Sequence, residues 1–196
     1  MKKNELRNKI LEKRRRMDSR ELSVISARAN EALSSLDLLH DARSVMVYSS
    51  FENEVDTWSF IEQTISSKGY VVLPKIKGCA GLAAYKITDI SHLVMSGLGI
   101  KEPDESVCET VEISDLDLII VPGVVFGRCG GRIGRGKGYY DNFLKEADGV
   151  ISIVGLAFDF QVFDKVPQHE NDVRMDRIVT EKEIIMCKKH RKENRE

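Results

Sequence analysis

Apolar residues recur at helical spacing through the N-terminal part of the chain. Residues 2–17 predict an amphipathic helix, because apolar side chains line one face among many lysines and arginines. The residues of that face are Leu6, Ile10, Leu11 and Met17. Asp18 can cap a second helix, which we expect over residues 20–39.

The next part of the chain alternates short β-branched runs with helical spacing. Residues 44–48 and residues 70–74 both predict strands. Between them a helix is expected to begin near Val55 and to end at Gly69. Two strands joined by a helix in this way are usually parallel neighbours with a right-handed crossover.

The remaining elements follow the same reasoning. Residues 96–105 contain two glycines and a proline, which predicts a loop. Residues 116–121 form a β-branched run that is stopped by Pro-Gly, which is typical of a buried parallel strand. The other expected elements are strands at 82–87, 150–156, 178–180 and 183–186 and a helix over 139–147.

Together these elements predict an α/β fold. We expect a three-layer sandwich around a mostly parallel open sheet, Rossmann-like and related to the sheets of sugar-phosphate isomerases and CoA-transferases. Residues 1–187 are expected to form a single domain. Residues 188–196 are almost wholly charged, so we expect a frayed tail.

Charge and cysteine content exclude several function classes. The 196 residues carry a formal net charge of −1, so no overall field attracts nucleic acid or an anionic membrane. The basic run at residues 13–16 is interpreted as a solvated helix face, balanced by nearby glutamates. Four scattered cysteines and the lack of a long apolar run favour a cytoplasmic protein with reduced thiols and no membrane segment. We expect a monomer.

The most informative segment is the run GGRIGRGKGYYD at residues 130–141. Its glycines allow the backbone to approach a ligand closely, and Arg132, Arg135 and Lys137 supply positive charge. A strand precedes the run and a helix is expected to follow it, an order that builds anion sites in α/β proteins. A triphosphate would suit this loop, although a solvated basic loop is the simpler alternative for a glycine–arginine run alone.

The same run is close to a Walker A motif but departs from it. Gly131, four residues, Gly136 and Lys137 match the pattern, whereas Gly138 stands where the magnesium-binding Ser or Thr belongs. The connection from the preceding strand is also longer than a P-loop uses. We therefore exclude a standard P-loop and expect Asp141 to be the nearest metal-binding carboxylate.

Two further polar segments carry candidate ligands. Residues 49–54 follow the first strand, where α/β sheets place ligands, and Glu54 could either cap the next helix or bind substrate. From the residues alone, capping is slightly favoured. Asp172 belongs to an acidic cluster near the C-terminus and could supply a second oxygen ligand for Mg²⁺. His169 is interpreted equally well as a loop residue or as a substrate contact.

Several segments, taken in order along the chain, resemble the 5-formyltetrahydrofolate cyclo-ligase family, also called methenyltetrahydrofolate synthetases. The most specific is Arg132-Ile133-Gly134-Arg135-Gly136-Lys137-Gly138-Tyr139-Tyr140-Asp141. The other segments are Lys3-x-x-Leu6-Arg7, Glu54-Val55-Asp56-Thr57, Val72-Leu73-Pro74, Glu102-Pro103, residues 121–126 and Asn171-Asp172. They span essentially the whole chain.

This resemblance implies an ATP- and Mg²⁺-dependent ligase. In the family's mechanism, the formyl oxygen of 5-formyltetrahydrofolate attacks the γ-phosphate of ATP to give an iminium phosphate. The nitrogen at position 10 then closes the ring, and 5,10-methenyltetrahydrofolate, ADP and phosphate are released. Such phosphoryl transfer asks the protein mainly to position the groups and to neutralise charge.

The resemblance also assigns roles to residues. It gives ATP binding to Lys3, Arg7, Arg132, Ile133, Gly134, Arg135, Gly136, Lys137, Gly138, Tyr139 and Tyr140, and Mg²⁺ binding to Asp141 and Asp172. It gives folate binding to Ser49, Glu54, Arg135, Gly136, Lys137, Gly138 and Tyr139, and catalysis to Arg135, Lys137 and Tyr139. For Glu54 the resemblance favours substrate binding over capping. Tyr140 is an equally good packing residue.

Three alternatives stay open from the sequence. An isomerase or CoA-transferase-like enzyme could use a similar sheet but would need no ATP and no paired carboxylates. A nucleic-acid-binding module would need a basic surface with exposed aromatics, which the charge of −1 and the 7% aromatic content disfavour. A non-catalytic folate-binding relative would be expected to have lost Arg135, Lys137, Asp141 or Asp172, all of which are present.

Overall fold

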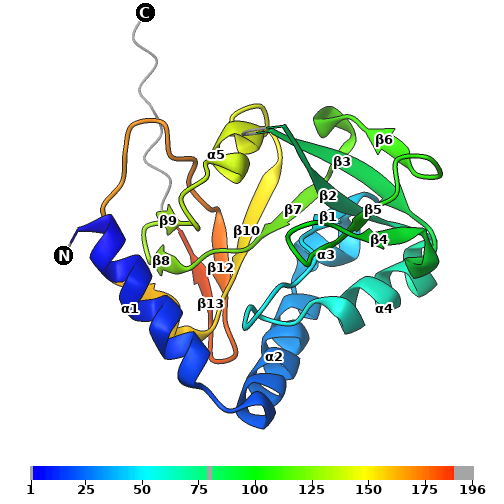
Figure 1. Cartoon of the computed structure of the whole chain (residues 1–196). Coiled ribbons are helices and arrows are strands. Elements are labelled where there is room, and N and C mark those ends of the chain that lie inside the picture. The colour runs from blue at the N-terminus through cyan, green and yellow to red at the C-terminus, as the bar shows by residue number, and fades with distance from the viewer. Residues whose placement is uncertain (1, 79–80, 188–196) are drawn as a thin grey trace, which may run out of the picture.

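The computed structural model describes residues 2–78 and 81–187, and within them an eight-stranded sheet forms the centre of the fold (Figure 1). The strand order is β13-β12-β10-β7-β1-β2-β3-β6. These strands are β1 Val45–Val47, β2 Val71–Lys77, β3 Gly81–Ile87, β6 Glu109–Val111, β7 Leu118–Val121, β10 Ser152–Leu156, β12 Arg177–Val179 and β13 Ile184–Met186.

The sheet is mostly parallel, as the sequence predicts. Strands β12, β10, β7, β1 and β2 run parallel to one another, and Met46 of β1 is paired to both Val72 and Ile119. The outer strands β13, β3 and β6 pair antiparallel. Chain order reverses between β1 and β7, because β1 leads to β2 on one side and β7 leads to β10 on the other. Open α/β sheets bind their ligands at such a reversal.

Helices and smaller elements cover both faces of the sheet. Helices α2 Ser19–Ser34, α3 Asp37–Asp41 and α4 Trp58–Lys68 lie on one face, and α5 Tyr139–Leu144 lies on the other (Figure 1). Successive side chains of β1 therefore point to opposite faces of the sheet. Val45 and Val47 pack in the cluster of α2 and α4, and Met46 packs in the cluster of α5. The three-layer α/β prediction is therefore confirmed.

Helix α1 Lys3–Arg16 packs away from the central sheet (Figure 1). Its apolar residues Leu6 and Ile10 are buried against Val124, Val125 and Ile133. Val125 and Ile133 belong to a three-stranded sheet of β8 Val125–Gly127, β9 Arg132–Ile133 and β11 Val162–Phe163, and Val124 directly precedes β8. The first half of the glycine run, predicted as loop, therefore includes the strand β9.

Three helix boundaries differ from the prediction. The helix expected over 139–147 ends at Leu144. The expected helix over 20–39 divides into α2 and α3, with Leu36 in extended conformation between them. The helix expected near Val55 begins instead at Trp58, because the Tyr48 hydroxyl donates to the Val55 carbonyl and Asp56 Oδ1 accepts from Trp58 N. Caps at Asp18 and Gly69 are confirmed.

Two other expectations are wrong. The predicted loop at 96–105 contains strand β5 Lys101–Pro103, which pairs with β4 Leu93–Met95 in a hairpin. The basic run at 13–16 is not uniformly solvated, because the Arg14 side chain is 2% exposed. Its local charge pattern gave no sign of this burial, which tertiary contacts impose.

The described residues also bear on membrane segments and on the cysteines. Within residues 2–78 and 81–187, no helix is both long and apolar enough to cross a membrane. Cys108, Cys129 and Cys187 carry free thiols, and Cys79 and the predicted tail at 188–196 lie outside the described residues.

Candidate active site

A cavity of about 1130 Å³ opens where the chain order of the sheet reverses. Ser49, which follows β1, and Pro122, which follows β7, both line it. The remaining walls come from the start of α1, the glycine run, the β4–β5 hairpin and the loop at 167–172. Pockets that bind drug-sized ligands measure roughly 300–1000 Å³, so this cavity lies slightly above that range.

The glycine run forms one wall through an unusual backbone. Gly136 has φ +97° and Gly138 has φ +76°, a region that other residues adopt with strain. A Cβ atom at Gly136 would also lie 3.4 Å from the Arg7 guanidinium, so the run and α1 approach closely here. Helix α5 has six residues, so its macrodipole is weak. Anion binding must therefore depend on the loop amides and on cations such as the exposed Lys137.

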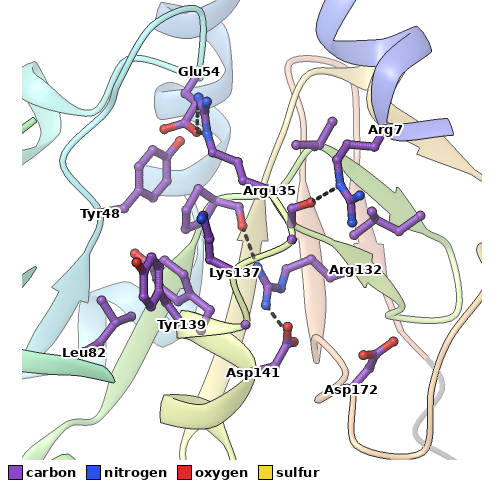
Figure 2. A pocket seen from close by; sticks show the side chains of 18 of the residues that line it. Arg7, Tyr48, Glu54, Leu82, Arg132, Arg135, Lys137, Tyr139, Asp141 and Asp172 are labelled. Carbon is purple, nitrogen blue, oxygen red and sulfur yellow. Dashed lines mark hydrogen bonds and ion pairs between the residues drawn. The ribbon is translucent and has the colours of Figure 1, made fainter. Parts of the chain in front are cut away.

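Helix α1 reaches across this wall with two cations. Arg7 Nε donates to the Gly134 carbonyl at 2.8 Å, which ties the helix to the glycine run (Figure 2). Lys3 Nζ donates to Asp172 Oδ2 at 2.5 Å. Asp172 also accepts from the backbone N–H of His169. Burial raises the pKa of Asp172, but these two donors outweigh it and hold the pKa below its usual value.

Arg132 and Asp141 form the second ion pair at this end of the cavity. Arg132 is 5% exposed, and its NH2 group donates to Asp141 Oδ1 at 2.8 Å (Figure 2). Its NH1 group donates to the Pro122 carbonyl at 3.3 Å, and its guanidinium lies over the Tyr140 ring. Arg132 thus fixes Asp141 against the loop. Its buried Nε has no partner among the described residues.

Asp141 and Asp172 are the carboxylates at this end of the cavity, and carboxylate oxygens are ligands that Mg²⁺ prefers. Among residues 2–78 and 81–187, no group of three or more His, Cys, Asp or Glu side chains could hold a metal by itself. However, Asp141 Oδ2 and Asp172 Oδ1 accept no hydrogen bond from the described part of the chain, and both residues line the cavity. Mg²⁺ needs only one or two carboxylates when phosphates and water complete its shell. The donor set therefore fits Mg²⁺ together with a phosphate.

The opposite end of the cavity is built around Glu54, which follows β1. Glu54 Oε2 accepts from the Phe51 N–H at 3.2 Å, and its Oε1 accepts from Arg135 NH2 at 3.2 Å (Figure 2). Arg14 NH2 lies 3.9 Å from the same Oε1. Burial raises the pKa of Glu54 above its usual value, although Arg14 and Arg135 both oppose this shift.

Three other side chains complete this end. The Tyr48 hydroxyl is buried and donates to the Val55 carbonyl, and burial raises its pKa well above the usual value. Burial likewise raises the pKa of Tyr140, which packs against both main core clusters. Ser49 Oγ is buried without a hydrogen-bond partner in the described residues. Such an unpaired hydroxyl is costly unless a ligand satisfies it.

Every site residue predicted from the sequence lines this one cavity. The set comprises Lys3, Arg7, Ser49, Glu54, Arg132, Ile133, Gly134, Arg135, Gly136, Lys137, Gly138, Tyr139, Tyr140, Asp141 and Asp172. His169 lines it too. Glu54 does not cap α4, whose first N–H is instead bound by Asp56, so the capping interpretation is wrong. The individual roles stay predictions.

Sequence reasoning missed Tyr48 and three further residues of the site. Gln168 lines the cavity, and its buried Nε2 has no partner among the described residues. Phe51 lies under the Arg135 guanidinium, 5.2 Å from it. Arg14 contacts Glu54 from α1, and its helical spacing from Lys3 and Arg7 was the one signal that could have revealed it.

Comparisons with known proteins agree with this geometry. Residues 1–181 match the model of the 5-formyltetrahydrofolate cyclo-ligase family. The chain is 34% identical over 146 residues to the 5-formyltetrahydrofolate cyclo-ligase of Escherichia coli K12, a match that covers 73% of this chain and 80% of the relative.

Solved structures agree as well. The NMR structure of Aquifex aeolicus 5,10-methenyltetrahydrofolate synthetase superposes with a TM-score of 0.85 at 35% identity, over 97% of this chain and 95% of that one. A 5,10-methenyltetrahydrofolate synthetase from Mycoplasma pneumoniae superposes with a TM-score of 0.74 at 26% identity, over 92% and 99%. Sequence, fold and cavity therefore agree that the chain belongs to the 5-formyltetrahydrofolate cyclo-ligase family.

Proposed function

We propose that this protein converts 5-formyltetrahydrofolate and ATP into 5,10-methenyltetrahydrofolate, ADP and phosphate in the presence of Mg²⁺. The observation that carries the proposal is the composition of one cavity. A wall of glycines and cations, with the carboxylates Asp141 and Asp172, lies at one end, and the buried Glu54 lies at the other. Family membership supports the same reaction.

The chemistry explains why one cavity must hold both substrates. A formamide oxygen is a poor leaving group, so it must be activated before the ring can close. Attack of that oxygen on the γ-phosphate expels ADP and makes the oxygen part of a phosphate ester. The nitrogen at position 10 then adds to the formyl carbon and loses its proton, and phosphate leaves. The protein contributes mainly positioning and charge neutralisation.

The phosphate end suits the transfer step. Lys137 is exposed to the cavity, and Arg135 extends from the same run, so both can approach equatorial phosphate oxygens. Asp141 and Asp172 would hold Mg²⁺ by their free oxygens. There the ion would neutralise phosphate charge. Lys3 and Arg7 would close over the nucleotide from α1, which the glycine run already contacts.

The folate end suits a pterin ring. Glu54 is an acceptor for ring N–H groups, and Ser49 offers an unsatisfied hydroxyl beside it. Tyr139 lines the cavity on the side of Leu82 (Figure 2), and we expect it to contact both substrates there. The cavity is complete within one chain, which supports a monomer as the active unit.

Direct formation of the product tests the proposal. Purified protein is mixed with ATP, Mg²⁺ and 5-formyltetrahydrofolate, and the methenyl chromophore is followed in the near-ultraviolet. We expect absorbance to rise only when all three are present. No product from folded protein would overturn the proposal, and product formed without ATP would point to an isomerase- or transferase-like reaction.

A further inference from the structure

Arg14 is the buried cation of α1 that sequence reasoning placed in solvent. Its side chain is 2% exposed, although it belongs to a run of four basic residues. Arginine is seldom buried unless its charge is paired. Packing alone therefore does not explain why this guanidinium is buried.

The backbone contacts of Arg14 hold it in one orientation. Arg14 Nε donates to the Asn53 carbonyl at 2.7 Å, and Asn53 Nδ2 donates back to the Arg14 carbonyl at 2.7 Å. This reciprocal pair joins α1 to the segment directly before Glu54. The Arg14 NH2 group then lies 3.9 Å from Glu54 Oε1, and NH1 is buried without a partner in the described residues.

Position on the helix explains why Arg14 reaches the site. At about 100° per residue, Lys3, Arg7 and Arg14 fall within about 40° of one another around α1. Lys3 binds Asp172, Arg7 binds the glycine run and Arg14 binds the Glu54 segment. One face of one helix thus contacts both ends of the cavity.

The charged and titratable groups that face Glu54 come from four elements. They are Arg14 of α1, Arg135 of the glycine run, Tyr48 directly after β1 and Tyr140 of α5, and Glu52 acts through its ion pair with Arg135. Arg135 is 39% exposed and lies over Phe51, so it is the more accessible of the two cations. Arg135 is also a residue that the phosphates of ATP would attract.

We propose that Arg14 is a positioning residue that keeps Glu54 ionised and directed at the pterin ring when Arg135 turns toward the phosphates. This inference rests on the proposed function, which assigns Glu54 to the folate. An ionised Glu54 accepts hydrogen bonds from ring N–H groups, and a buried carboxylate without a cation would take up a proton and lose part of that capacity. Arg14 acts through Glu54 and touches neither substrate.

Four variants of the full-length protein test this inference. They are Arg14→Gln, Arg14→Lys, Glu54→Gln and, as the matched control on the exposed side of the same helix, Arg15→Gln. We expect Arg14→Gln to raise KM for 5-formyltetrahydrofolate about tenfold or more, since it removes one partner of a buried charge pair. KM for ATP should change by less than about twofold, and Arg15→Gln should behave like the wild type.

The pH profile separates positioning from a purely structural role. Removing Arg14 leaves Glu54 with one cation fewer, so the acid limb of kcat/KM for the folate should move to higher pH in Arg14→Gln. Arg14→Lys keeps the charge and should restore part of that limb. If the limb stays in place, or if KM for ATP rises as much as KM for the folate, the inference is wrong.

Equilibrium binding of 5-formyltetrahydrofolate without ATP separates this inference from the proposed function. In the Glu54→Gln background, Arg14→Gln should weaken binding by less than about twofold, because the group on which it acts is gone. Equal losses in both backgrounds would overturn the inference. If wild-type protein binds the folate but forms no product, the proposed function fails, and the binding comparison still decides the role of Arg14. If Arg14→Gln does not fold, Arg14→Met, which removes the charge and keeps an apolar stem, replaces it in both backgrounds.

Discussion

The two ends of the cavity hold carboxylates of similar exposure in opposite electrostatic conditions. The Asp172 side chain is 14% exposed and the Glu54 side chain is 10% exposed. Yet the pKa of Asp172 is lowered and that of Glu54 is raised. Figure 2 shows them on opposite sides of the view, with Arg132 and Lys137 between them.

Depth of burial explains the difference, because each carboxylate accepts from one backbone N–H and one cation, and burial outweighs these donors only at Glu54. Asp172 accepts from an ammonium at 2.5 Å and from a backbone N–H at the rim. Glu54 lies deeper, beside the buried Tyr48, and its nearer guanidinium belongs to the partly exposed Arg135. Exposed area alone therefore does not predict how a carboxylate titrates. The phosphate end can bind a metal with ionised oxygens, whereas the folate end depends on its cations to stay ionised.

The largest expected effect lies at the phosphate end. Lys137→Ala should lower kcat at least about a hundredfold, because it removes charge that faces the transferred phosphoryl group. Binding of 5-formyltetrahydrofolate without ATP should weaken by a much smaller factor than kcat falls, although the resemblance also assigns Lys137 to the folate. Initial rates of methenyl formation and equilibrium binding measure the two quantities. Lys145→Ala, at the exposed end of α5 and outside the cavity, is the control. A near-normal rate in Lys137→Ala would mean that the glycine run has been misinterpreted.

A smaller effect should distinguish the metal ligands from other acidic residues. Asp141→Asn removes one anionic oxygen and should raise the Mg²⁺ concentration needed for half-maximal rate about tenfold or more. The exposed Asp148→Asn should leave the Mg²⁺ dependence unchanged. Titration of Mg²⁺ at saturating ATP and folate measures this. An unchanged midpoint in Asp141→Asn would remove this residue from the metal site.

The smallest effects concern stability and should have opposite signs at the two ends. A folded pKa below the unfolded value, as for Asp172, gives stability that is present above the unfolded pKa and lost as pH falls through the folded pKa. A folded pKa above the unfolded value, as for Glu54, gives stability that is present below the unfolded pKa and lost as pH rises through the folded pKa. At neutral pH the first carboxylate stabilises the fold and the second destabilises it.

Thermal unfolding of two isosteric variants measures these signs. At about pH 7, Asp172→Asn should lower the unfolding midpoint and Glu54→Gln should raise it, each by a few degrees at most. As pH falls, the Glu54→Gln difference should shrink first, because the raised pKa of Glu54 means that it takes up its proton at higher pH. The Asp172→Asn difference should persist until pH falls through the lowered pKa of Asp172. Asp148→Asn serves again as the control. Shifts of the same sign at neutral pH would contradict the contrast between the two ends.

Sequence patterns anticipated much of the fold because they report local physics. The β-branched run at 116–121, the cap at Asp18 and the left-handed Gly69 all mark elements that form for reasons contained in a few neighbouring residues. The β4–β5 hairpin was missed because its strands are short and much of their surface is exposed, which leaves little periodic signal.

The sequence likewise predicted some residues of the site and missed others. The motif at 132–141 named its members through its resemblance to one family, because a glycine–arginine run alone is explained as well by a solvated basic loop. Gln168 gave no signal, because an isolated glutamine in a loop looks the same whether it faces solvent or a cavity. Helical spacing places Arg14 on the face of Lys3 and Arg7 but does not say which face is buried.

By itself, the sequence determined the α/β class, the glycine-rich anion loop and the family to which the chain is similar, because each depends on residue types at short spacing. Only the tertiary structure decided that α1 contacts both ends of one cavity and that Asp172 and Glu54 titrate in opposite directions. Burial and long-range charge pairs depend on which distant segments meet, and folding alone brings those segments together.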